Sequence, residues 1–518
     1  MSYKIDLIVT PIEASDEKKI LSIVSRQLKT PEHRIAYIRT LRKSIDARSR
    51  LIKVNLSLEI FIDEKPQKRF QKQPEWQNVN GKTPVVVVGA GPAGLFAALR
   101  LIEFGIKPIV IERGKDVNSR KKDIALLNRN NGLNADSNYC FGEGGAGTFS
   151  DGKLYTRSKK RGDNESVFEL FVLHGAPEEI LFEAHPHIGS DKLPGIIKNI
   201  RETILKYGGE VHFNSRVDNL IIKDNIIKGV LTSTNERIEA AAVILATGHS
   251  AKDVYKMLHK REIALESKNF AMGVRVEHPQ ELIDHNQYNG LDRENFLPAA
   301  TYSLVHQSRD RGVYSFCMCP GGFIVPAASG QGEMVVNGMS PSKRNSPFAN
   351  AGIVVEIRQE DLNEFSSFGP LAGLMYQESI EKLAYINGGN GLIAPAQKIS
   401  DFVKGKMSSE LPPSSYNPGI IPSPMHFWLP ENIAARLADG FKNFDNKIRG
   451  FVSDDAVMLG VESRTSSPVR IPRDRESFQH VTVKGLFPCG EGAGYAGGIV
   501  SSAVDGQRAA EMAGSYIK

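Results

Sequence analysis

Cysteine is scarce in this chain, with four residues (Cys140, Cys317, Cys319 and Cys489) among 518. So few cysteines in so long a chain do not form the disulfide framework of small secreted proteins, and they fit a reducing compartment. Long apolar runs are absent too, because no segment approaches the ~18 uninterrupted apolar residues needed to cross a bilayer. The opening residues also lack the apolar core of a signal peptide. We therefore expect a soluble, cytoplasmic protein without membrane association.

A strong charge of either sign is also lacking. The formal net charge of +6 is mild; it could help attract an anionic substrate, but it does not by itself indicate nucleic acid. Glycine, by contrast, is frequent at 47 residues, most of them in a few clusters. At about 150 residues per domain, the length predicts two to four domains.

Residues 1–70 are predicted to form a small α/β domain in which two helices lie between two strands. A strand over 3–9 precedes the first helix, and an alternating strand over 54–60 follows the second. The second helix, over 34–50, is predicted because apolar residues recur at roughly helical spacing, at Ile35, Ile38, Leu41 and Ile45. Its basic residues are Arg34, Arg39, Arg42, Lys43, Arg48 and Arg50. They could contact RNA or a phosphate-bearing partner, but without interleaved aromatics a solvated face is favoured.

The pattern G-x-G-x-x-G occurs three times, at Gly89/Gly91/Gly94, Gly142/Gly144/Gly147 and Gly492/Gly494/Gly497. Only the first has a strand of valines before it, an amphipathic helix after it and a strand that ends in an acid, Glu112. In such a βαβ unit the glycines allow a tight turn, a close approach to a pyrophosphate and close helix packing. The helix N-terminus suits phosphates, and Glu112 is placed to bind the adenosine ribose. The motif alone does not distinguish FAD from NAD.

Two further segments favour FAD. Residues 210–248 resemble the β-rich segment of FAD enzymes of the glutathione-reductase-like superfamily, and residues 485–511 resemble their second flavin-contacting segment. Shorter motifs narrow the resemblance, namely FGEGGAGTFSDGKLYTR, VRVEHP, CMCPGGFIVPA, NGMSPSKRN, GVESRTSSPVRIPRD and PCGEGAGYAGGI. Together they resemble the bacterial FAD-dependent dehydrogenase-like proteins described as NAD(FAD)-utilizing dehydrogenases. The resemblance covers nearly the whole chain and implies an FAD-binding fold, but it leaves the substrate open.

The expected fold class is α/β, with a discontinuous Rossmann-type FAD-binding domain interrupted by an inserted mixed α+β substrate domain. The expected boundaries are 1–70 for the N-terminal α/β domain, 71–83 for a linker, 84–265 for the first part of the FAD-binding domain, 266–454 for the inserted substrate or cap domain, and 455–518 for the C-terminal part of the FAD-binding domain.

The resemblance also implies positions for FAD. The backbone of Val217 would meet adenine, a small-residue loop would follow the isoalloxazine, and the helix after Gly498 would aim at its pyrimidine end. Glu491 departs from the Asp that is common at its position, which should shift that contact. The residues expected to bind FAD are Gly89, Ala90, Gly91, Pro92, Ala93, Gly94, Glu112, Arg113, Gly114, Gly144, Gly145, Ala146, Gly147, Thr148, Val217, Ala246, Thr247, Gly248, Gly490, Glu491, Gly497, Gly498 and Ile499.

Candidate substrate-binding residues are basic. Lys153 is expected near the substrate pocket, and Arg275, Arg464 and Arg470 could grip a carboxylate, although a structural ion pair is the commoner role of any single arginine. Cys317 and Cys319 are interpreted as small residues in a strand, because no second pair completes a zinc site and their disulfide ring would be strained. No metal is expected, and spacing does not select a catalytic acid or base.

The sequence thus favours an FAD-dependent oxidoreductase, a dehydrogenase or reductase that moves a hydride through flavin N5. NADH or NADPH, if used, would bind transiently, because only one dinucleotide motif is complete. Two alternatives stay open: a flavin-bearing sensor or binding module whose N-terminal domain contacts RNA or a protein, and a reductase of a hydrophobic, polyprenyl-like substrate. The oligomeric state is not predicted.

Overall fold

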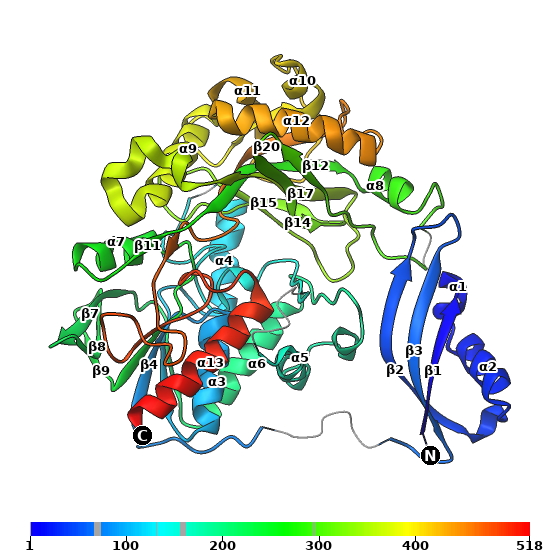
Figure 1. The fold of residues 1–518 in the computed structure, drawn as a ribbon, viewed down its shortest axis with the longest axis horizontal. Helices are drawn as coiled ribbons and strands as arrows, with labels where there is room; N and C mark the ends of the chain where they lie inside the picture. Colours follow the sequence, from blue (N-terminus) through cyan, green and yellow to red (C-terminus); the bar gives the residue numbers. More distant parts are fainter. Residues whose placement is uncertain (1, 67–73, 131, 156–161, 294–295) are drawn as a thin grey trace.

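The computed structural model of the chain describes residues 2–66, 74–130, 132–155, 162–293 and 296–518. Three parts are visible in Figure 1: an N-terminal domain on the right, a nucleotide-binding domain at the lower left, and an inserted domain across the top. We describe them in that order.

The N-terminal domain is a three-stranded antiparallel sheet with two helices beside it. Its strands lie in the order β1–β3–β2, and alternate residues of β3 are buried against α2. The elements are β1 (Ser2–Val9), α1 (Pro11–Ala14), α2 (Glu17–Leu28), β2 (Ile35–Asp46) and β3 (Lys53–Ile62). The backbone of Lys43 in β2 bonds to Phe182 and Ala184, which attaches this domain to the next one.

The helix predicted over 34–50 is wrong, because Ile35–Asp46 is the strand β2. The register between β2 and β3 shifts twice, between Ile35 and Tyr37 and between Thr40 and Arg42. Each shift adds a residue to one strand and breaks the two-residue alternation, so the apolar spacing imitates that of a helix. The predicted basic helix face is therefore absent, and several of its arginines pair with acids: Arg34 with Asp63, Arg39 with Glu59 and Arg48 with Asp46.

The linker predicted over 71–83 packs on the nucleotide-binding domain in its described part. Val79 is fully buried and its N–H donates to the carbonyl of Tyr207 at 2.8 Å. The Trp76 ring lies 5.5 Å from the Tyr207 ring, centroid to centroid. Residues from 74 onward thus extend this domain rather than spanning between domains.

The nucleotide-binding domain contains a five-stranded parallel sheet in the order β22–β10–β4–β5–β6. The central strand β4 is almost entirely valine and buried, as expected for a parallel strand covered on both faces. The strands are β4 (Pro84–Val88), β5 (Lys107–Ile111), β6 (Glu210–His212), β10 (Ala242–Leu245) and β22 (Leu486–Pro488). The predicted βαβ unit is confirmed, and the sheet joins segments about 400 residues apart in the chain, which gives the discontinuous Rossmann-type fold.

Helices α3 (Pro92–Glu103) and α13 (Ile499–Ile517) lie side by side on this sheet (Figure 1). They approach closely because Gly506 has no side chain; a Cβ there would lie 2.0 Å from the carbonyl oxygen of Ala93. A small antiparallel sheet covers another side, with β7 (Val217–Lys223), β8 (Ile226–Thr232) and β9 (Arg237–Glu239). The other helices are α4 (Val117–Asn128), α5 (Asn164–Leu173), α6 (Leu193–Lys206) and α7 (Lys252–Lys260).

The inserted domain is built on a seven-stranded, mainly antiparallel sheet in the order β13–β14–β17–β12–β20–β18–β19. Its strands are β12 (Phe270–Pro279), β13 (Val305–Ser308), β14 (Arg311–Cys319), β17 (Phe348–Ile357), β18 (Ala394–Lys398), β19 (Ile420–Pro422) and β20 (Val457–Glu462). Since β20 pairs with both β12 and β18, the boundary expected at 454 is corrected to a point after Glu462. The short pairs are β15 (Phe323–Pro326) with β16 (Val336–Met339), and β11 (Glu266–Ser267) with β21 (Val469–Arg470).

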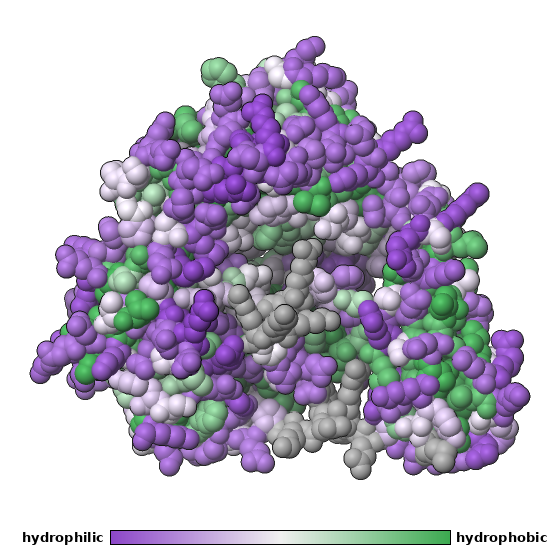
Figure 2. Space-filling view, in the orientation of Figure 1, coloured by the Kyte–Doolittle hydropathy of each residue, from purple (hydrophilic) through white to green (hydrophobic). Residues whose placement is uncertain are grey.

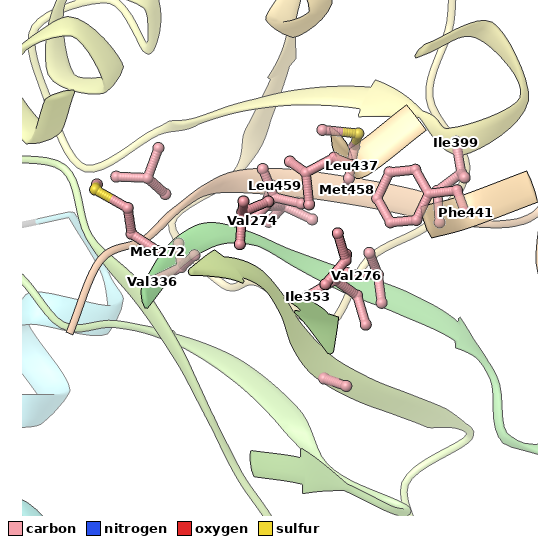
Figure 3. Close-up of a cluster of buried hydrophobic side chains, with 14 of the residues drawn as sticks. Met272, Val274, Val276, Val336, Ile353, Ile399, Leu437, Phe441, Met458 and Leu459 are labelled. Atoms are coloured by element: carbon pink, nitrogen blue, oxygen red, sulfur yellow. The ribbon is translucent and has the colours of Figure 1, made fainter. Parts of the chain in front are cut away.

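Helices cover one side of this large sheet (Figure 1). Figure 3 shows apolar side chains of β12, β20 and α12, among them Val276, Leu459 and Phe441, gathered between the strands and the helices. The helices are α8 (Gln280–Gln287), α9 (Ala372–Asn387), α10 (Ile399–Lys404), α11 (Met425–Trp428) and α12 (Glu431–Lys447). This core fixes the position of β14, whose last residues reach the site described below.

The surface is mostly polar. In Figure 2 hydrophilic side chains cover most of this face, and the larger apolar patches lie over the N-terminal domain on the right. No helix among the residues that the structure describes combines the length and hydropathy required to span a membrane.

Candidate cofactor site

A cavity of about 360 Å³ opens at the carboxyl ends of the parallel strands. Val88 and Ile111, the last residues of β4 and β5, line it, and so do Ala246 and Cys489, which directly follow β10 and β22. Open α/β sheets bind nucleotides at this edge. The cavity therefore lies where the sequence placed the dinucleotide.

Two helix N-termini converge on the cavity. Helix α3 begins after Gly91 and α13 begins after Gly498, and neither N-cap residue provides a side-chain hydrogen bond. The first N–H groups of each helix thus keep their partial positive charge available to an anion. A pyrophosphate at the N-terminus of α3 and a negatively charged flavin ring at that of α13 would both be stabilised by these N–H groups.

Glu112 organises the turn around this cavity. Its carboxylate is buried and accepts three backbone hydrogen bonds at 2.9 Å, from the N–H groups of Ala90, Gly114 and Gly142. A carboxylate offers about four lone-pair sites, so one site remains for a ribose hydroxyl. Glu112 also faces the cavity, as its expected role requires.

Several glycines leave open space that a ligand can occupy. A Cβ added at Gly248, Gly497 or Gly498 would meet no atom within 4 Å, and all three residues line the cavity. Gly145 lies against Gly91, where a Cβ on Gly145 would come 3.1 Å from the Gly91 Cα. The glycine loop and the dinucleotide turn thus pack backbone against backbone and together form one wall of the cavity, which a ligand can approach closely.

Most residues expected to bind FAD line this cavity: Gly89, Gly91, Pro92, Ala93, Glu112, Arg113, Gly145, Ala146, Gly147, Val217, Ala246, Thr247, Gly248, Gly490, Glu491, Gly497, Gly498 and Ile499.

Five expected residues, Ala90, Gly94, Gly114, Gly144 and Thr148, are not among the residues that line the cavity, and they shape its walls from behind. Their contact with FAD stays a prediction. A Cβ on Gly94 would lie 1.8 Å from the Gly89 carbonyl oxygen, and one on Gly144 would lie 1.9 Å from the Thr148 Oγ1. The Thr148 hydroxyl is buried and donates to the Glu143 carbonyl at 2.7 Å. These residues allow the chain to fold tightly behind the ligand-facing surface.

The Gly490–Glu491 segment is fixed by contacts with Asp505. The Gly490 N–H donates to the Asp505 carboxylate at 2.8 Å, and Arg473 pairs with that same carboxylate at 2.6 Å. Glu491 faces the cavity with its Oε1 3.7 Å from the His249 Nδ1. The longer Glu side chain therefore has a polar neighbour that the sequence did not reveal.

The cavity also carries a set of groups outside the expected FAD positions. Lys153, Tyr155, Phe316 and Cys317 line it, together with Asp151. Asp151 is buried and accepts two hydrogen bonds from the Arg344 guanidinium, at 2.8 and 3.2 Å. Burial raises the pKa of Asp151, but the charges of Lys153 and Arg344 more than offset this effect and lower it. Lys153 thus lines the cavity, and its raised pKa favours its cationic form. Its place beside a substrate stays a prediction.

Arg275 does not face the cavity, which corrects its expected role in substrate binding. Its side chain is fully buried, and its Nη1 lies 2.7 Å from the Glu462 Oε2. Burial raises the pKa of Glu462 to about 7, against the lowering effect of Arg275. Arg275 is thus a structural ion-pair partner that joins β12 to β20.

Arg464 is likewise corrected, because it belongs to a buried network of charges. It contacts Glu333 at 2.8 Å and Glu381 at 3.2 Å, and Lys252 reaches Glu381 at 2.6 Å. Arg470 lies 3.5 Å from Glu266. Neither arginine lines the cavity.

The sequence did not predict Cys317, His249, Asp151, Tyr155 or Phe316 as cavity residues. Asp151 and Tyr155 flank Lys153 in the motif FGEGGAGTFSDGKLYTR, and His249 directly follows Ala246-Thr247-Gly248. These three residues could have been found because they lie next to a motif that the sequence analysis had identified. Cys317 opens the quoted motif CMCPGGFIVPA and Phe316 directly precedes it, but the motif does not indicate that this part of the inserted domain reaches the cavity.

Three family models match parts of the chain. They are a domain of unknown function over residues 1–61, an FAD binding domain over 82–126, and the model described as FAD-dependent protein, C-terminal domain-like, over 269–465. An uncharacterized protein of Clostridium beijerinckii is 42% identical over 516 residues, which cover 96% of this chain and 95% of that protein. The chain belongs to the same family as that protein. It is a flavoprotein family with an FAD-binding domain.

Solved structures share less with this flavoprotein. A geranylgeranyl bacteriochlorophyll reductase-like protein from Thermoplasma acidophilum is 15% identical with a TM-score of 0.36, over 84% of this chain and 79% of that one. CtdE in complex with FAD is 12% identical with a TM-score of 0.30, over 83% and 82%. At such low scores neither structure informs the activity of this chain.

Proposed function

We propose that the protein is an FAD-dependent oxidoreductase, a dehydrogenase or reductase that handles a small, anionic substrate. The observation that carries the proposal is the lining of the cavity, in which Lys153 and the inserted-domain residues Phe316 and Cys317 join the predicted dinucleotide positions. A cofactor pocket that also carries a cation and residues of a second domain can take a second molecule beside the ring. The resemblance to NAD(FAD)-utilizing dehydrogenases supports the same reaction class.

When bound, FAD would supply the hydride-accepting chemistry at its N5 atom. The chain would hold it through the backbone around Gly91, the Glu112 carboxylate at the ribose and the N-terminus of α13 at the pyrimidine end. The residues 145–147 would follow the ring closely because they carry little or no side chain. These residues position the cofactor and exclude water from one face.

Lys153 would attract and orient the substrate. Its pKa is raised because the Cys319 and Cys317 thiols and Asp151 more than offset the lowering effect of burial, so it carries its charge at neutral pH. A cation at this place stabilises a carboxylate, and it also stabilises negative charge that develops on a reacting oxygen.

A nicotinamide donor, if used, would enter this same space transiently. The two other G-x-G-x-x-G segments contribute Gly147 and Gly497 to this same cavity. Stopped-flow mixing of the anaerobic holoprotein with NADH, NADPH and a panel of small acids tests the proposal. We expect one of them to bleach the flavin absorbance within a single turnover; a flavin inert to the whole panel would contradict the proposal.

The alternative of an RNA-contacting sensor has weaker support. The basic helix on which it depended is a strand, and Arg34, Arg39 and Arg48 pair with acids of the same domain. No observation favours the polyprenyl-like substrate over an anionic one.

A further inference from the structure

Two cysteines of the inserted domain meet the cavity at its Lys153 end. Cys317 is partly exposed and lines the cavity, whereas Cys319 is fully buried behind it. The Cys319 thiol lies 3.3 Å from the Cys317 carbonyl oxygen. The two thiols also share a hydrogen bond, so the side chains form a pair of which Cys317 lines the cavity and Cys319 does not.

The backbone at Cys317 is unusual. Strand β14 pairs regularly with β17 up to Phe316, and its register then shifts before Cys319. Cys317 itself has a φ of +46°, in the left-handed region that a residue with a side chain seldom adopts. Bulges and left-handed non-glycine residues occur preferentially beside functional sites. Packing of small residues in a strand explains the buried Cys319, but it does not explain this local distortion.

Two cations surround the pair. The Arg275 Nη2 donates to the Cys317 carbonyl at 2.7 Å and lies 3.6 Å from the Cys319 Sγ. The Lys153 Nζ lies 3.9 Å from that sulfur and donates to the Met318 carbonyl. The Cys319 hydrogen bond, followed by the charges of Lys153 and Arg275, lowers the pKa of Cys317, whereas the pKa of Cys319 is raised by its bond to Cys317 and by burial.

We propose that Cys317 and Cys319 are a redox-active pair that exchanges two electrons with the flavin and, through Cys317, with a small disulfide substrate. The proposal rests on the proposed function, because it requires FAD in the cavity. It adds a substrate class, and it gives Lys153 and Arg275 the role of positioning residues around the sulfurs.

The electron balance is simple. When the pair reduces the flavin, the Cys317 thiolate and the Cys319 thiol form one S–S bond and release two electrons and one proton, which together reduce FAD to its anionic two-electron-reduced form. In the other direction the reduced flavin breaks that S–S bond, which the strain of its short ring makes easy to reduce. Cys317 then attacks an external disulfide, one half leaves as a thiolate, and Cys319 displaces the other half as the internal S–S bond forms again.

Electron counting tests the pair in the holoprotein. We would oxidise the protein with glutathione disulfide, remove the excess, and titrate it anaerobically with dithionite. The account predicts an uptake of four electrons per FAD in the unchanged protein and of two in Cys317→Ser, which lacks the thiol that attacks glutathione disulfide. Cys319→Ser should instead retain one glutathione on Cys317, because no second thiol displaces it. Cys140→Ser, a matched change at another partly exposed cysteine, should still take up four. An uptake of two electrons in the unchanged protein overturns the proposal, whereas protein that holds no FAD overturns the proposed function.

Alkylation gives an independent readout that needs no turnover. At about pH 7, iodoacetamide should label Cys317 faster than Cys140, because the thiolate is the reacting form. Lys153→Met should slow Cys317 labelling about tenfold, the effect of raising its pKa by one, whereas Lys256→Met, on the exposed side of α7, should not. Equal labelling of Cys317 and Cys140, or no effect of Lys153→Met, would overturn the proposal.

Discussion

The Arg275 guanidinium and the Glu462 carboxylate form an ion pair of 2.7 Å, and their side chains are 0% and 1% exposed. Arg275 also donates to Asn350 Oδ1 at 2.8 Å, so the pair joins the three central strands of the inserted sheet directly behind the cavity. A buried pair of this kind stabilises a fold mainly because either partner alone would be an uncompensated charge.

Replacing Arg275 should therefore destabilise the protein in a pH-dependent way. Arg275→Met should cost about 3–5 kcal/mol of unfolding free energy at about pH 8, because Glu462 loses its counter-charge and must either stay buried and charged or take up a proton. The cost should shrink at about pH 5. The pKa of Glu462 is raised in the folded protein to about 7 from 4.5, so the folded protein keeps this carboxyl protonated at about pH 5. The free energy of unfolding therefore falls as the pH rises from 4.5 to about 7.

Urea unfolding at both pH values measures this effect. The control is Arg358→Met, which removes a half-exposed arginine paired with Glu356 at 3.0 Å and should cost no more than about 1 kcal/mol. An equal cost of Arg275→Met at the two pH values would contradict the assignment.

Glu112→Gln should weaken FAD binding sharply. The carboxylate accepts three backbone hydrogen bonds, and an amide would point N–H groups at a backbone donor. The loss of charged hydrogen bonds is worth about 1.5–3 kcal/mol, or about 10- to 150-fold in Kd. Fluorescence titration of the apoprotein with FAD measures it, and Glu239→Gln, an exposed acid on β9, should bind FAD as the unchanged protein does.

Two glycine substitutions should separate packing from ligand binding. Gly94→Ala places a Cβ 1.8 Å from the Gly89 carbonyl oxygen, so it should lower the stability of the apoprotein. Gly497→Val projects into open space, so it should leave the thermal midpoint of the apoprotein unchanged and abolish FAD binding. Full FAD binding by Gly497→Val would place the cofactor elsewhere.

Glu381→Gln should destabilise the protein by about 3–5 kcal/mol at neutral pH, because it breaks a buried charge network. Burial raises the pKa of Glu381, but Arg464 and Lys252 more than offset this effect and lower it to about 2. The stabilisation is therefore present above the ordinary value of 4.5 and is lost as the pH falls toward 2. Chemical unfolding between about pH 7 and about pH 3 should show the unfolding free energy of the variant approaching that of the unchanged protein as the pH falls. A difference that stays constant over this range would contradict the assigned charge network.

The nucleotide-binding half could be predicted from the sequence because its signals are local. The run of valines, the glycine turn and the helix after it lie within about 30 residues. The observed elements β4, α3 and β5 agree closely with those predicted from them. The N-terminal domain shows the limit of such signals. The two register shifts in β2 disguised a strand as a helix, and periodicity carries no information about bulges.

The substrate end was less predictable because its groups meet only through the folded chain. Arg275 and Arg464 were candidates until Glu462 and Glu381, 187 and 83 residues away from them, proved to neutralise them. Cys317 was interpreted as a strand residue, and only the bulge in β14 turns it toward the cavity.

The most direct test of the account is the absorbance spectrum of the protein as purified, with the released cofactor identified by chromatography. The account predicts a yellow protein that carries one FAD per chain. A well-folded protein that shows no flavin spectrum and accepts no added FAD would contradict it.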